Sequence, residues 1–353
     1  MASQYFTLTD GHKLPPIGLG TFTITNEQEL ETALDVALET GYRHIDTALF
    51  YRNEHIIGKV LKKWFNSGKL KREDVFVTTK LPGCQPPEKV EFYVKKSLED
   101  LQLDYIDLYL IHSPICFDID SNLPFNKMKL LPSDLVATYK KMEELVERGL
   151  CKTIGISNFN QRQVKKILDN AKIIPATNQV ELHIYLQQPE LVKFCQDNGI
   201  VMVSYLTFGN PGLGKWLESN NMPARNYPDI LNDPTVKKIA DKHKKTTAQV
   251  LLKFMIQKNI AVIPKSVTPS RIRENFNIFD FTLDKADITE MEKLDKGEAG
   301  RNTWFDYNED YEFWDTEEKY HQFFIWGILG TDAYTHLGLL VLVMSNYSRS
   351  SCI

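Results

Sequence analysis

The chain has 353 residues, of which 42% are hydrophobic and 25% charged, and its 42 Lys and Arg against 46 Asp and Glu give a formal charge of −4. This composition is typical of a globular protein with a sizeable core, and it excludes intrinsic disorder as a description of the whole chain. The slight acidic balance provides no positive field to hold a polyanion, so we do not expect a nucleic-acid partner.

The cysteines and the first residues indicate the compartment. The five cysteines are scattered, without a CxxC pair, and no histidine pair has the spacing of metal ligands. We therefore expect reduced thiols, a cytoplasmic protein and no metal site. The opening MASQYFTLTDGHKLPPIG has neither the basic nor the apolar stretch of a secretory signal, which favours the same location.

Short runs rich in β-branched residues predict eight strands. Several runs are apolar throughout, as is typical of strands that are buried on both faces. The predicted strands cover residues 14–21, 43–48, 75–80, 106–112, 151–158, 176–182, 201–206 and 261–266. Before them, the sequence YFTLTDGHKL predicts a small hairpin that turns at Asp10-Gly11.

Amphipathic stretches separate the predicted strands. In NEQELETALDVALETG, Asn26 is a suitable N-cap and Gly41 a suitable C-terminal residue, and residues 132–149 and 270–276 are further helical patterns. Length alone suggests about two domains. However, no linker or composition shift divides residues 1–300, and eight strands alternating with helices predict one (β/α)₈ barrel.

A doubly wound dinucleotide-binding sheet is the competing fold. Its fingerprint requires G-x-G-x-x-G between the first strand and the first helix. The chain has Gly18-Leu19-Gly20, but Thr23 stands at the third glycine position and a polar loop follows in place of a helix. The sequence therefore favours the barrel.

Polar residues at the predicted strand ends indicate a site, because barrel chemistry lies at the carboxyl ends of the strands. Asp46 lies in the predicted strand 43–48, Tyr51 follows that strand, and Lys80 and His112 end the next two predicted strands. Each alone has an ordinary structural explanation, such as a loop-capping aspartate or a satisfied buried histidine. Their convergence favours a functional site, since a dry barrel mouth does not tolerate unpaired polar groups.

Together these four residues are suited to donate a proton from Tyr51. A free tyrosine has a pKa near 10 and is a poor acid at pH 7. We expect the Lys80 ammonium to lower the pKa of Tyr51, Asp46 to orient Lys80, and His112 to orient a carbonyl. An acid aimed at a developing alkoxide fits carbonyl reduction, provided that a hydride donor lies opposite.

Four segments carry a family resemblance: GYRHIDTALFYRNE (41–54), LDYIDLYLIHSP (103–114), GISNFN (155–160) and IPKSVTPSRIRENF (263–276). In this order and spacing they resemble the aldo-keto reductases, and in particular the aldose-reductase-like branch. The resemblance implies a (β/α)₈ barrel that reduces aldehydes or ketones with NADPH, forming NADP⁺, and whose partner is a small-molecule carbonyl substrate. We expect it to act as a monomer.

By this resemblance, the four polar residues match the catalytic tetrad of the family: Asp46, Tyr51, Lys80 and His112. Nine more positions match the cofactor-binding residues of the family. Those that hold the nicotinamide are Ser157, Asn158, Gln179 and Tyr205, whose ring stacks on it. Those that bind the adenosine 2′-phosphate or lie near the adenine are Lys265, Ser266, Arg271, Glu274 and Asn275.

The substrate pocket departs from the aldose-reductase type. Phe22 and Ser113 stand where that type has tryptophan, and Phe50 stands where a smaller apolar residue is common. With His112, these residues are expected to line the pocket. Serine at position 113 removes a wall, so specificity for sugar aldehydes does not carry over. Reduction of bulky ketones such as steroids is therefore an alternative.

A second departure follows Tyr205. The family usually continues Ser-Pro-Leu-Gly, whereas this chain has Leu206-Thr207-Phe208-Gly209, near the pyrophosphate in relatives. A cofactor-binding barrel with vestigial catalysis is thus a further alternative, although the complete tetrad favours an active enzyme. Loops at about 115–132 and 209–228 are expected to cover the barrel mouth.

The C-terminal segment is the third departure. We predict a barrel over residues 1–315 and an atypical tail over 316–353, where relatives have usually ended. Apolar residues 323–344 are about enough to cross a bilayer, but Asp332 lies inside and costs about 2.5–3.5 kcal/mol at mid-bilayer. We expect a partly buried or disordered extension, with membrane contact through the tail as the alternative.

Overall fold

The computed structural model describes residues 5–119, 129–132, 134–209 and 228–303, all within one compact unit. The predicted domain boundary at residue 315, the tail over 316–353 and most of the expected loop at 209–228 lie outside the described residues. Within the described ranges, no helix has both the length and the apolar character needed to cross a bilayer.

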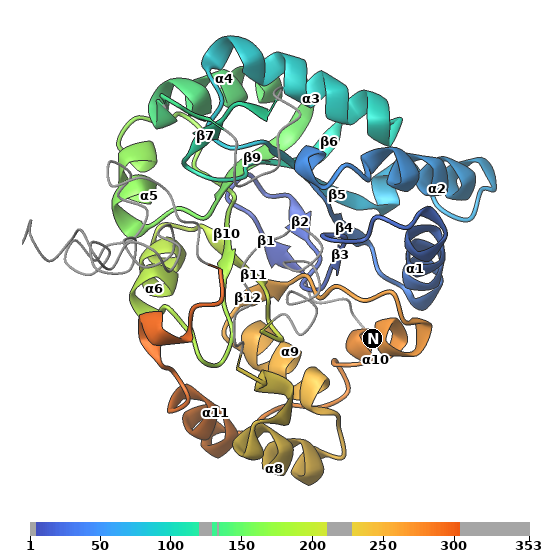
Figure 1. The fold of residues 1–353 in the computed structure, drawn as a ribbon, viewed down its shortest axis with the longest axis vertical. Helices are drawn as coiled ribbons and strands as arrows, with labels where there is room; N and C mark the ends of the chain where they lie inside the picture. The colour runs from blue at the N-terminus through green and yellow to red at the C-terminus, as the bar shows by residue number, and fades with distance from the viewer. Residues whose placement is uncertain (1–4, 120–128, 133, 210–227, 304–353) are drawn as a thin grey trace, which may run out of the picture. The chain divides into compact units, whose positions relative to one another are not determined.

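Eight parallel strands form the central sheet and confirm the eight predicted strands in order. They are β3 (Leu19–Gly20), β4 (His44–Asp46), β5 (Phe76–Leu81), β6 (Ile106–Ile111), β9 (Cys151–Ser157), β10 (Thr177–Glu181), β11 (Val201–Tyr205) and β12 (Ile260–Val262). Each strand hydrogen-bonds to the next, and Figure 1 shows the helices as an outer ring around them.

A short seam between the first and last strands closes the sheet into a barrel. Ile17 bridges Val262 in parallel, the Gly18 N–H donates to the Val262 carbonyl at 2.8 Å, and the Val262 N–H donates to Pro16 at 2.9 Å. The seam strands are shorter than predicted because their prolines provide no N–H to the ladder. A closed barrel excludes the doubly wound sheet, whose edges stay open.

The predicted N-terminal hairpin is also confirmed. Strands β1 (Phe6–Thr7) and β2 (Lys13–Leu14) pair antiparallel, with Gly11 in the turn at φ +88°. Leu8 and Leu14 are buried in a cluster with side chains from inside the barrel, namely Leu108, Leu110, Ala176, Val203, Ala261 and Ile263. Several of these residues lie at or near strand starts, so the hairpin closes the amino end of the barrel and leaves the carboxyl end for chemistry.

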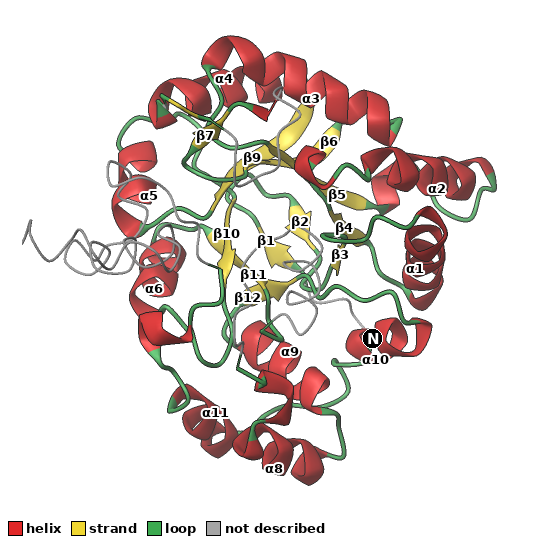
Figure 2. Ribbon diagram, viewed as in Figure 1, coloured by secondary structure: helices red, strands yellow, loops and turns green. Residues whose placement is uncertain are grey.

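The described chain has ten α-helices, and they cover the barrel, as Figure 2 shows. They are α1 (Glu27–Thr40), α2 (Glu54–Asn66), α3 (Pro87–Leu101), α4 (Leu135–Glu147), α5 (Gln161–Leu168), α6 (Pro189–Asp197), α8 (Pro234–His243), α9 (Thr247–Gln257), α10 (Pro269–Phe276) and α11 (Lys285–Glu292). The predicted ends of α1 are confirmed, because the Asn26 side chain accepts from the Glu29 N–H and Gly41 adopts φ +117°.

One segment is more regular than expected. Residues 115–132 were predicted as a loop, but a two-stranded antiparallel ribbon lies at its two ends. The ribbon consists of β7 (Cys116–Phe117) and β8 (Leu130–Leu131).

The burial of Leu8 inside the barrel predicts that substitutions at two hairpin positions have different effects on the free energy of unfolding. Leu8→Ala removes a side chain that is 2% exposed and leaves a cavity, so it should lower the free energy of unfolding by about 2–5 kcal/mol. Tyr5→Ala, at a position 42% exposed, should change it by less than about 0.5 kcal/mol. Urea unfolding of both variants checks this, and equal losses would show that the hairpin does not close the barrel.

Candidate active site

The fold brings the four predicted polar residues to the carboxyl ends of three neighbouring strands. Asp46 is the last residue of β4, Lys80 lies near the end of β5, and His112 directly follows β6. Tyr51 ends the 3₁₀ turn η1 (Leu49–Tyr51), which follows β4. Because β4, β5 and β6 are adjacent in the sheet, side chains from sequence-distant segments meet at one point.

Lys80 is at the centre of this group and is fully buried. Its Nζ lies 2.6 Å from Asp46 Oδ1, 2.8 Å from the Thr47 carbonyl oxygen and 3.4 Å from Tyr51 Oη. An ammonium has three N–H bonds, and these three acceptors match them. The contact with the phenol oxygen of Tyr51 is the longest and weakest of the three. It can therefore strengthen if negative charge develops on that oxygen.

The pKa of Tyr51 is shifted opposite to the sequence-based expectation. Burial, together with the Asp46 carboxylate, holds the pKa of Tyr51 well above 10. The prediction of a lowered pKa for Tyr51 was wrong in direction, because desolvation of the buried phenolate dominates the shift. Tyr51 therefore carries its proton at neutral pH. Burial also lowers the pKa of Lys80, and Asp46 opposes that shift.

His112 faces Tyr51 as a neutral ring. Burial and the nearby Lys80 ammonium hold the pKa of His112 well below 6.5. Its ring packs edge-on to Tyr51 with centroids 5.6 Å apart and to Phe50 at 6.5 Å, and Phe22 packs against Tyr51 at 5.0 Å. A neutral imidazole has one N–H donor, so His112 is suited to hydrogen-bond a polar atom placed beside Tyr51.

The predicted pocket residues differ in their surroundings. The ring of Phe22 packs against Tyr51, and the ring of Phe50 packs against His112. Ser113 is buried, and its Oγ accepts a hydrogen bond from the Ile115 N–H at 3.1 Å. The serine hydroxyl therefore stabilises the local turn after β6.

The residues assigned to the nicotinamide form one hydrogen-bonded row. Ser157 Oγ donates to the Gln179 carbonyl oxygen at 2.7 Å, and Tyr205 Oη donates to Asn158 Oδ1 at 2.7 Å. Asn158 adopts φ +64°, a left-handed conformation that asparagine tolerates, and its Nδ2 donates to the His112 carbonyl oxygen at 2.8 Å. The row thus lies directly beside the tetrad.

Gln179 joins this row to the tetrad, a connection that sequence reasoning missed. Its Nε2 donates to Asp46 Oδ2 at 2.7 Å, while Lys80 occupies Asp46 Oδ1. Both carboxylate oxygens are therefore engaged, which fixes the plane of the Asp46 carboxylate. The two residues are 133 positions apart, and no local pattern signals their contact.

The residues assigned to the adenosine 2′-phosphate and the adenine lie just before α10 and along it. Lys265 and Arg271 are exposed, and neither makes a hydrogen bond or salt bridge to another described residue. Ser266 Oγ accepts from the Thr268 N–H at 3.1 Å just before the helix. Farther along, Glu274 Oε1 accepts from Thr246 and Asn275 is buried. Two cations beside a helix N-terminus, neither of them hydrogen-bonded or salt-bridged within the described ranges, suit a phosphate.

Comparison with known proteins decides the family. The model of the aldo/keto reductase family matches residues 16–296. The chain belongs to this family. It is 44% identical to aldose reductase B of Dictyostelium discoideum over 82% of the chain and 92% of that protein, and 39% identical to prostaglandin F synthase 1 of Bos taurus over 83% and 92%. The solved structure of the aldose reductase from Schistosoma japonicum matches with a TM-score of 0.74 and 39% identity, covering 84% of the chain and 93% of that structure.

Family membership confirms the predicted aldo-keto reductase resemblance and the barrel. It also makes the protein an oxidoreductase that acts on carbonyl groups, the chemistry that the tetrad suggested.

Sequence reasoning also missed a second carboxylate of this aldo-keto reductase. Glu54 is buried, and its Oε1 accepts from the Thr79 hydroxyl at 2.5 Å and its Oε2 from the Ser97 hydroxyl at 3.0 Å. Burial raises the pKa of Glu54 to about 7. In the sequence, Glu54 resembles any acidic residue in the first turn of a helix. Such residues are ordinarily exposed, so no sequence pattern marks Glu54 as buried.

Glu54 predicts a pH dependence of stability. Its folded-state pKa of about 7 lies above the usual 4.5, so between these values the folded protein keeps a proton that the unfolded chain has released. Stability should therefore fall as pH rises through this window, by about 3 kcal/mol in total. Glu54→Gln should remove this contribution. Urea unfolding of both proteins from pH 5 to 8 measures the difference, and parallel profiles would contradict it.

Proposed function

We propose that the protein reduces aldehydes or ketones to alcohols by hydride transfer from NADPH, with Tyr51 as the general acid. The observation that carries this proposal is the buried Lys80 ammonium, held by Asp46 and aimed at the phenol of Tyr51. A protonated phenol beside a fixed cation is a suitable acid for a developing alkoxide.

The charge and polarity of the described residues fit NADPH. Lys265 and Arg271 are exposed cations just before and in the first turn of α10, and neither has a salt-bridge partner in the described part of the chain. This suits the 2′-phosphate that distinguishes NADPH from NADH. At the other end, the amide groups of Asn158 and Gln179 suit a carboxamide. When bound, NADPH supplies the hydride.

Each tetrad residue then has a defined task. Tyr51 gives its proton to the carbonyl oxygen as negative charge develops there. Lys80 stabilises the phenolate that remains, and this stabilisation grows as charge develops, which favours the transition state over the ground state. Asp46 keeps the ammonium in place, and the neutral His112 donates an N–H to orient the carbonyl.

The substrate class has two candidates. Small aldehydes fit the resemblance to the aldose reductases, whereas Ser113 in place of tryptophan favours bulkier ketones such as steroids. A barrel that binds the cofactor without turnover is the remaining alternative, and its support is the unusual Leu206-Thr207-Phe208 stretch. There Leu206 adopts φ +55°, a strained value for leucine. We further propose that the enzyme works as a cytoplasmic monomer.

Loss of NADPH absorbance with a panel of small aldehydes and steroid ketones tests the activity. Substrate-dependent oxidation supports the proposal, and the ratio of kcat/KM values for the two groups separates the substrate classes. Tight NADPH binding without turnover over the whole panel would favour the vestigial barrel.

The assignment of Tyr51 as the general acid predicts that removing its hydroxyl lowers turnover. Tyr51→Phe should lower kcat by about 10²- to 10⁴-fold, because it removes the transferable proton, while the Kd for NADPH stays close to that of the wild type. The matched control is Tyr139→Phe, which removes a hydroxyl that donates to the Ile173 carbonyl outside the site. Retained turnover in Tyr51→Phe would refute the assignment.

The phosphate site predicts a cofactor-specific loss. Arg271→Ala should raise the Kd for NADPH by roughly 10- to 100-fold, the range expected for one charge-assisted contact, and leave the Kd for NADH nearly unchanged. Arg273→Ala changes another exposed arginine of the same helix and should affect neither value. Fluorescence titration gives both constants. Equal weakening of both cofactors would place the phosphate elsewhere.

A further inference from the structure

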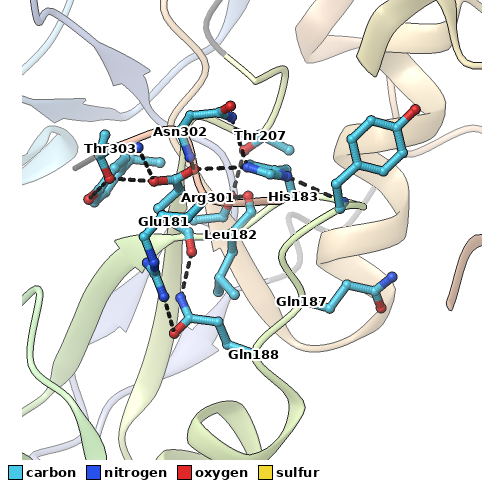
Figure 3. Close-up of polar contacts among 12 residues, drawn as sticks. Glu181, Leu182, His183, Gln187, Gln188, Thr207, Arg301, Asn302 and Thr303 are labelled. Carbon is cyan, nitrogen blue, oxygen red and sulfur yellow. Dashed lines mark hydrogen bonds and ion pairs between the residues drawn. The ribbon is translucent and has the colours of Figure 1, made fainter. Parts of the chain in front are cut away.

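A buried carboxylate outside the tetrad holds the last described residues of the chain at the barrel mouth. Glu181 ends β10, and Figure 3 shows its side chain surrounded by donors. Its Oε1 accepts from the Asn302 N–H at 2.6 Å and from His183 Nε2 at 2.9 Å. Its Oε2 accepts from the Thr303 N–H at 2.8 Å and also from the Thr303 hydroxyl.

The ionised form of Glu181 is favoured in this position. Burial raises the pKa of Glu181, but the hydrogen bond and charge of His183, with contributions from Arg301 and Thr303, outweigh burial and lower the pKa overall. A carboxylate only accepts hydrogen bonds. The proton of the Thr303 hydroxyl is therefore committed to Glu181, and the lone pairs of Thr303 Oγ1 remain available to another donor.

That donor is the phenol of Tyr205. Glu181 and Tyr205 are direct partners on the neighbouring strands β10 and β11. Tyr205 Oη lies 2.7 Å from Asn158 Oδ1 and 3.4 Å from Thr303 Oγ1. A phenol has one proton, so the two acceptors compete for it. The shorter distance gives the proton to Asn158, and Thr303 is the second acceptor.

We propose that Thr303, oriented by Glu181, is a positioning residue that holds the Tyr205 ring against the nicotinamide while Asn158 binds the carboxamide. This inference rests on the proposed function, in which Asn158 and Tyr205 contact the cofactor. When Asn158 Oδ1 turns to the cofactor, the Tyr205 phenol loses its nearest acceptor. Thr303 Oγ1 then takes the Tyr205 proton, so the ring keeps a fixed hydrogen bond.

The hydroxyl of Thr303 is separable from the fold of this segment. The N–H groups of Asn302 and Thr303 bind Glu181 whatever side chain stands at position 303. Thr303→Val therefore keeps both backbone contacts and the shape of the side chain, and it removes only the link between Glu181 and Tyr205. Thr303→Ser keeps the hydroxyl.

The test compares two ligands that share the phosphate site. Thr303→Val should raise the Kd for NADP⁺ by roughly 3- to 10-fold, as expected for one hydrogen bond, while the Kd for 2′,5′-ADP, which lacks the nicotinamide, stays within about 2-fold. Thr303→Ser should restore the wild-type Kd for NADP⁺. Thr40→Val, which removes a partly buried hydroxyl bonded to the Val36 carbonyl oxygen, should change neither constant.

Three outcomes are distinct. An unchanged Kd for NADP⁺ in Thr303→Val overturns the inference, as does an equal weakening of both ligands, which indicates a general disturbance of the fold. Thermal unfolding of each variant shows directly whether the fold is kept. If the wild-type protein binds 2′,5′-ADP and NADP⁺ with equal affinity, the nicotinamide is not recognised, and the proposed function itself fails.

Discussion

The buried ion pair between Lys80 and Asp46 is the constraint on which the active site depends. Moving an ammonium and a carboxylate out of water costs several kcal/mol per ion, and their attraction repays this only with good geometry and further hydrogen bonds. Here Lys80 has the Thr47 carbonyl and Tyr51 as additional acceptors, and Asp46 has Gln179 as an additional donor. A buried ion pair is weak evidence for stability, so this arrangement is better explained by the cation that it presents to Tyr51.

The barrel supplies the geometry of this pair. Parallel strands end on the same side, so neighbouring strands bring Asp46 and Lys80 together without a long loop. The hairpin fills the opposite end with Leu8 and Leu14. Because apolar side chains fill that end, the polar side chains of the tetrad lie at the carboxyl end of the barrel.

The sequence predicts much of this architecture, and the reasons lie in its residue patterns. Apolar strands buried on both faces are visible as continuous runs, and the tetrad is visible because polar residues interrupt those runs at their ends. The cofactor-binding positions came from family resemblance and not from any periodicity. The contacts of Gln179 with Asp46 and of Glu181 with Thr303 join residues 133 and 122 positions apart, so no local pattern reveals them. The direction of the Tyr51 pKa shift was missed because it depends on burial.

These long-range contacts change how the cofactor residues are understood. Asn158 donates to the His112 carbonyl oxygen and accepts from Tyr205, and Gln179 donates to Asp46. The side chains assigned to the nicotinamide are thus hydrogen-bonded to two tetrad residues, His112 and Asp46. A ligand that accepts from the N–H group of either amide would compete with the His112 carbonyl oxygen or with Asp46 for that donor. The tetrad and the amide side chains assigned to the nicotinamide therefore belong to one hydrogen-bond network.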